Sequence, residues 1–77
     1  MFHELNTLAK YNDWTVVHIT DDEWAANVSD HAQVIVTSLN DTLVQVDVTY
    51  DGDLIAALEV DKHDAVATAS DLVKHNL

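Results

Sequence analysis

The 77-residue sequence contains no cysteine, no proline and no arginine, and its single glycine is Gly52. The absence of cysteine excludes a disulfide framework and a cysteine-based zinc site. One glycine cannot build a phosphate-binding loop or the glycine-flanked turn that carries the nucleophile of many hydrolases. Stability must therefore come from packing and turn geometry, in a domain whose small size leaves a thin margin.

Positive charge is also scarce, because three lysines stand against 14 acidic residues and give a formal net charge of −11. A surface of this sign repels the phosphates of nucleic acids and of anionic membranes. We therefore expect no direct nucleic-acid binding. No apolar run approaches the roughly 20 residues of a membrane span. The N-terminus lacks the basic and apolar regions of a signal peptide, so a cytoplasmic protein is expected.

The length suits one small domain over residues 1–77, and an apolar content of 48% lies well above that of disordered chains. Residues 2–11 carry apolar side chains at helical spacing and predict an amphipathic helix. Residues 14–20 are rich in β-branched and aromatic side chains and predict a strand.

Residues 20–31 allow two interpretations. Thr20 and Glu23 have the spacing of a capping box, and acids in the first turn suit the helix dipole, so a short helix is predicted over about 21–30. The alternation of Trp24, Ala26 and Val28 instead indicates a strand over residues 23–30. We predict the helix and keep the strand as the alternative.

The second half of the chain predicts an antiparallel meander. Asp51-Gly52 is typical of a two-residue type I′ hairpin turn, which needs positive φ at both positions. Asn40-Asp41 is expected to form a second two-residue turn. The turns separate three strand-like segments, residues 32–39, 42–50 and 53–60.

Asp61 is expected to cap a final helix over about 62–76. The complete prediction is an α+β domain of order α-β-α-β-β-β-α, with the C-terminal meander packed on helices. With residues 23–30 as a strand, the fold becomes a five-stranded meander between two helices.

The two faces of the meander differ in character. One face is consistently apolar, whereas the other mixes apolar with polar side chains, and an antiparallel sheet with one wet face alternates more cleanly. The mixed face is therefore predicted to be buried by a partner, in a homodimer formed through the sheet face or its edge. Scattered surface apolar residues are the alternative. The apolar face comprises Val34, Val36, Val44, Val46, Val48, Tyr50, Leu54, Ala56, Leu58 and Val60. The expected interface residues are Ile35, Leu39, Leu43 and Ile55.

Candidate ligating residues are few. Asp71 and His75 are four residues apart on the last helix and Asp64 lies on the same stripe, but two ligands do not make a metal site. A solvated helix face explains this pattern, so neither metal nor cofactor is predicted. His18 shares a face with Trp14 and Val16 under strict alternation, which predicts a hydrogen-bonded core or edge histidine rather than a pH switch.

No constellation supports catalysis, so an enzyme is not expected. The function predicted is a small acidic interaction or regulatory module, homodimeric and binding another protein. One alternative is a cation-binding protein using Asp64, Asp71 and His75. The other is an inhibitor of a nucleic-acid-binding protein, in which carboxylates imitate phosphates. The imitating residues would be Asp21, Asp22, Glu23, Asp30, Asp61, Asp64 and Asp71.

Overall fold

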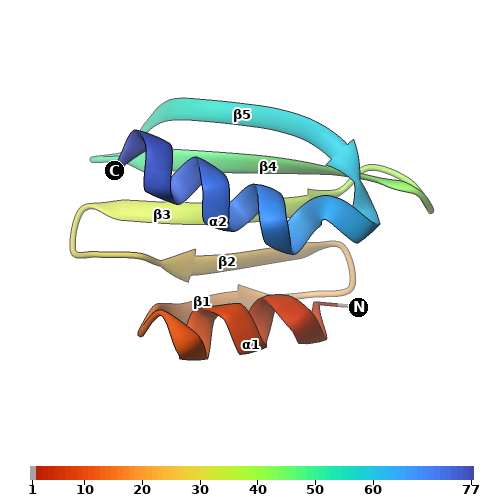
Figure 1. Ribbon diagram of the computed structural model, residues 1–77, viewed down its shortest axis with the longest axis horizontal. Coiled ribbons are helices and arrows are strands. Elements are labelled where there is room, and N and C mark those ends of the chain that lie inside the picture. Colours follow the sequence, from red (N-terminus) through yellow and green to blue (C-terminus); the bar gives the residue numbers. More distant parts are fainter. Residues whose placement is uncertain (1) are drawn as a thin grey trace.

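The computed structural model describes residues 2–77, which form two α-helices and one five-stranded sheet (Figure 1). All neighbouring strands pair antiparallel in the order β1-β2-β3-β4-β5. The elements along the chain are α1 (His3–Tyr11), β1 (Thr15–Ile19), β2 (Glu23–Asn27), β3 (Ala32–Ser38), β4 (Leu43–Tyr50), β5 (Asp53–Asp61), the 3-10 turn η1 (Lys62–Asp64) and α2 (Ala65–Asn76).

The α+β class is confirmed, but the helix predicted over residues 21–30 is wrong, and β2 occupies this segment as the alternative proposed. The hydroxyl of Thr20 accepts hydrogen bonds from the amides of Asp22 (3.3 Å) and Glu23 (3.0 Å), as a helix cap would. The Thr20 amide, however, donates to the Glu23 carbonyl (2.8 Å) and closes a hairpin turn. Such local bonds serve turns and helix starts alike, and complete burial of Trp24 and Ala26 favours the strand.

The Asp51-Gly52 hairpin is confirmed, since both residues have positive φ, 51° and 84°. The turn predicted at Asn40-Asp41 is wrong, because β3 and β4 are joined by a wider loop over residues 39–42. In this loop Asn40 Oδ1 accepts from the amides of Thr42 and Leu43, each at 2.9 Å. A side-chain oxygen that bonds nearby amides stabilises a longer turn than two residues allow.

The final helix begins as predicted, with Asp61 Oδ1 accepting from the His63 amide at 2.9 Å. Its first turn is the 3-10 segment η1, and the α-helix proper follows from Ala65. Neither helix in the described part of the chain is long and apolar enough to cross a membrane.

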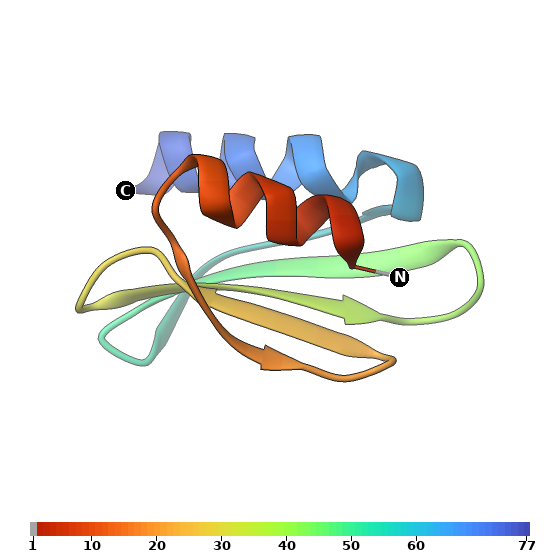
Figure 2. The ribbon, with the colours of Figure 1, turned by 90° about the horizontal axis from the view of Figure 1, so that it is seen from below.

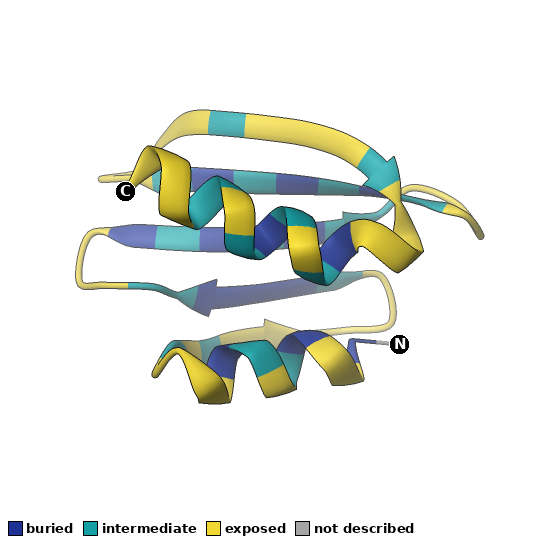
Figure 3. Cartoon of the chain, viewed as in Figure 1, coloured by how far each residue is buried: buried dark blue, intermediate teal, exposed yellow. Residues whose placement is uncertain are grey.

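Both helices cover the same face of the sheet, and the core lies between the two layers (Figure 2). Trp24 on β2 is completely buried, and its indole Nε1 donates to Asn6 Oδ1 on α1 at 2.8 Å. Ala65 and Ala69 are the buried residues of α2. The dark blue segments of the central strands in Figure 3 include Val34, Val36, Val44, Val46 and Val48.

Candidate functional site

The second face of the sheet carries neither helix (Figure 2). A row of paired residues crosses it from His18 on β1 to Ala57 on β5, through Ala25, Ile35 and Asp47. The Asp47 carboxylate accepts from Gln45 Nε2 at 2.9 Å and is half-buried. A charged group therefore stands beside Ile35 in the middle of this open face.

The four predicted interface residues do not form one contiguous patch. Ile35 and Leu43 are half-buried on the open face, but a polar row of paired residues on adjacent strands separates them. Leu39 is exposed in the β3–β4 loop, and Ile55 is exposed at the irregularity of β5. The separating row consists of Glu23, Thr37, Gln45 and Glu59.

The predicted position of His18 beside Trp14 and Val16 is wrong. The β1–β2 register shifts between Val16 and His18, so Val16 pairs with the buried Ala26 whereas His18 pairs with Ala25 on the open face. One extra residue in a strand reverses the direction of every side chain beyond it. The half-exposed His18 ring lies 3.2 Å from the Glu23 carboxylate (Nε2 to Oε1).

A similar irregularity in β5 changes the predicted apolar face. The register shifts after the Val48–Ala56 pair, so Leu54 pairs with Thr49, away from the core side. Leu54, Ile55 and Leu58 are 59%, 42% and 48% exposed. Leu58 points to the core face as predicted and pairs with the buried Val46, but its place on the edge strand leaves it uncovered. Apolar surface therefore gathers along β5.

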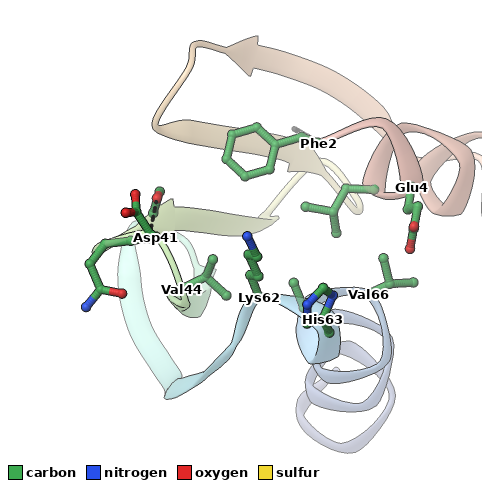
Figure 4. A pocket seen from close by; sticks show the side chains of 11 residues that line it. Phe2, Glu4, Asp41, Val44, Lys62, His63 and Val66 are labelled. Atoms are coloured by element: carbon green, nitrogen blue, oxygen red, sulfur yellow. Dashed lines mark hydrogen bonds between the residues drawn. The ribbon is translucent and has the colours of Figure 1, made fainter.

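A pocket of about 320 Å³ lies between the start of α1, the β3–β4 loop and the start of α2 (Figure 4). Phe2 and Val66 contribute apolar walls, and Glu4, Asp41 and Lys62 place charges of both signs around it. With no excess of cationic groups and no buried polar side chain directed into it, this pocket does not define a ligand class.

The His31–Asp51 pair lies at the opposite end of the sheet, in a polar hollow. His31 Nδ1 is 2.8 Å from Asp51 Oδ1, and the Asp51 amide donates to the His31 carbonyl at 2.7 Å. Both side chains are exposed, so the ionic contribution is small. The hydroxyl of the nearby Ser29 accepts from the His31 backbone amide (3.3 Å). The pair joins the β2–β3 and β4–β5 turns and does not activate a nucleophile.

The three candidate metal ligands are not brought together. His75 Nδ1 bonds to the backbone carbonyl of Asp71 at 2.7 Å, and Asp64 lies at the other end of α2. Across residues 2–77, no cluster of three histidine, cysteine or acidic side chains has the geometry to hold a metal ion.

The proposed phosphate-imitating carboxylates are divided between the two ends of the sheet. The Ser38 amide donates to the Asp22 carbonyl (2.7 Å), which places the β1–β2 turn beside the β3–β4 loop. The start of α2, with Asp61 and Asp64, lies at this same end (Figure 1). Asp30 lies in the β2–β3 turn at the other end, and Lys62 interrupts the acidic group.

We expect salt to stabilise this fold. Screening of a net charge of −11 should raise the free energy of unfolding by on the order of 1 kcal/mol, or about 4–8 °C in Tm. Thermal unfolding at low protein concentration, from about 10 mM to 1 M sodium chloride, measures this effect. Because the Debye length falls from about 30 Å to 3 Å over that range, most of the rise should occur below about 0.3 M. A flat or falling Tm would contradict this expectation.

The described residues thus offer two surfaces left free by the helices, the open sheet face and the outer edge of β5. A third hollow, between the end of α2 and β5, is lined by Tyr50, Ile55 and Leu77 among others, and none of the three hollows carries a selective set of polar groups. Comparison with protein-family models, curated proteins and solved structures found no match for this chain.

Proposed function

We propose that this chain is a small interaction module that functions as a homodimer and binds through its sheet rather than through a pocket. The observation that carries the proposal is the apolar surface along β5, where Leu54, Ile55 and Leu58 are all between 42% and 59% exposed. Both helices lie over one face of the sheet, so no element of the described chain covers the outer side of β5. An edge strand that exposes apolar side chains on both of its faces, beside unpaired backbone groups, is suited to an interaction site.

A second copy suits this surface for energetic reasons. A domain of this size buries a smaller share of its unfolded surface than a larger domain does, and a stable dimer contributes about 800 Å² of additional burial per subunit. The net charge of −11 opposes association of two identical chains, and salt screens that repulsion. The proposed dimer should therefore be weak at low ionic strength and tighter at high ionic strength.

The test is the mass of the protein in solution. Sedimentation equilibrium over a hundredfold range of concentration should show a species of twice the 8.5 kDa chain mass. The dimer fraction should increase with sodium chloride. A mass of one chain at every concentration and salt would contradict the proposed function.

A further inference from the structure

We infer that the homodimer forms by antiparallel pairing of β5 with β5 of a second copy, which joins two five-stranded sheets into one continuous sheet. This inference rests on the proposed function and names its contact. Edge-to-edge pairing about a two-fold axis is the symmetric way for a strand to satisfy the backbone groups on its unpaired side.

The two edges of the sheet differ in how well they accept another strand. β1 has five residues and a register shift in its middle, between Val16 and His18. β5 has nine residues with neither lysine nor proline among them, and its shift lies near its start, before Ala56. Short length, bulges, charged side chains (lysine above all) and proline are the features that protect an edge from pairing. β5 carries two carboxylates over residues 56–61, those of Glu59 and Asp61, but this stretch is longer and more regular than the edge that β1 offers.

The hydrogen-bond phase of β5 identifies which backbone groups are free. The Lys62 amide donates to the carbonyl of Thr42, the last residue of the β3–β4 loop, at 2.8 Å. Because alternate residues of an antiparallel strand bond to the same neighbour, the even-numbered residues before Lys62 face β4. Ala57 and Glu59 direct their N–H and C=O groups away from the sheet. In a self-pair, Ala57 exchanges both hydrogen bonds with Glu59 of the second copy.

This pairing centres the two-fold axis on Leu58. Leu58 then meets Leu58 of the second copy, with Ala56 opposite Val60 on the same core side. The two side chains, each 48% exposed in one subunit, cover one another. The two Leu58 residues form a non-hydrogen-bonded pair, the kind of antiparallel pair in which opposite side chains are closest.

Charge and strand regularity select this register over its neighbours. Centring on Glu59 would place the two Glu59 carboxylates opposite each other, and centring on Val60 would place Glu59 opposite Asp61 of the second copy. Like charges directly opposite each other destabilise a strand pair. Centring on Ala57 would draw the irregularity at Ile55 into the paired stretch, whereas the Leu58 register pairs the regular residues 56–60 with one another.

The open face is a poorer contact surface for the same dimer. A symmetric face-to-face contact through the row containing Ile35 would bury Asp47, and burying a carboxylate without a cationic partner is costly. Lysine in place of Ile35 should therefore leave the dimer intact, whereas lysine in place of Leu58 should weaken it at least tenfold. Ile19→Lys is the matched control, because it adds the same charge at an exposed apolar position on the opposite edge.

A single introduced cysteine tests the register directly, because the chain has none of its own. Cα atoms of a pair without mutual hydrogen bonds are about 4.5 Å apart, within the range of a disulfide. Leu58→Cys should form a covalent dimer on mild oxidation, and Ile19→Cys should stay monomeric under the same conditions. Circular dichroism establishes that both variants are folded. Equal cross-linking of both variants, or none of Leu58→Cys, would overturn the edge contact.

Amide hydrogen exchange of the unaltered chain gives a second readout. The Ala57 and Glu59 amides should become protected as concentration rises, while the Val60 amide, already bonded to β4, should not change. Dimer mass without this protection would overturn the edge contact and leave the proposed function standing. Monomer mass at all concentrations would overturn both.

Discussion

Replacement of Trp24 by alanine is expected to destabilise the fold by about 3–5 kcal/mol. Trp24 is completely buried on β2, and its indole bonds to Asn6 on α1 at 2.8 Å. The change removes the largest side chain of the core and leaves a cavity between α1 and the sheet. The total stability of a domain of this length is of the same order, about 5 kcal/mol. The Trp24→Ala chain should therefore keep a stability of only about 0–2 kcal/mol, so that up to about half of the molecules are unfolded at 25 °C.

Trp24→Phe is the matched control for this prediction. Phenylalanine retains most of the packing but cannot donate to Asn6 Oδ1, so its cost should be smaller, about 1–2 kcal/mol. Urea unfolding followed by circular dichroism measures both variants and avoids dependence on tryptophan fluorescence. Equal urea midpoints for Trp24→Ala and the unaltered chain would show that α1 does not depend on this side chain.

Several elements could be predicted from the sequence because their signals are local. The Asp51-Gly52 turn follows from residues that tolerate positive φ, and the start of the final helix follows from a capping aspartate, Asp61. The meander strands follow from period-two alternation, in which Val34 and Val36 or Val44, Val46 and Val48 point to one face. Each of these signals predicts the same local structure independently of how the rest of the chain packs.

The second strand and the place of His18 could not be predicted with certainty because their signals depend on partners. The bonds of Thr20 to the next amides satisfy a hairpin turn as well as a helix cap, and only burial of Trp24 against α1 distinguishes the two. The shift between Val16 and His18 leaves no mark in the composition of β1. Strict alternation therefore placed the imidazole on the wrong face.

The candidate interface was predictable only in part, for a related reason. The mixed character of the second face could be read from alternation, and helices do leave that face open (Figure 2). Whether Ile35 and Leu43 are neighbours depends on strand register, which places Thr37 and Gln45 between them. The exposure of Leu58 depends on strand order, because the same side chain would be buried on a central strand. The exposed surface of an edge strand can therefore be identified only when the strand order of the sheet is known.

Replacement of Ala69 by leucine should destabilise the fold by about 1–3 kcal/mol, although leucine is a good helix former. Ala69 is completely buried on the side of α2 that packs on the sheet, within the same cluster as Val46. Three additional carbon atoms there must displace α2 from the central strands or force side chains from their preferred rotamers. The effect should be measured by urea unfolding at low protein concentration, where association does not contribute.

Ala67→Leu is the matched control, because it makes the same substitution on the same helix at an exposed position. Its effect should lie within about 0.5 kcal/mol, as expected for surface changes. Both variants change helix propensity in the same way. The difference between their free energies of unfolding therefore measures the effect of the close approach of α2 to the sheet. An Ala69→Leu variant as stable as Ala67→Leu would mean that α2 can move away from β4 and β5 at little cost. The core face, rather than the β5 edge alone, would then have room to adapt to a partner.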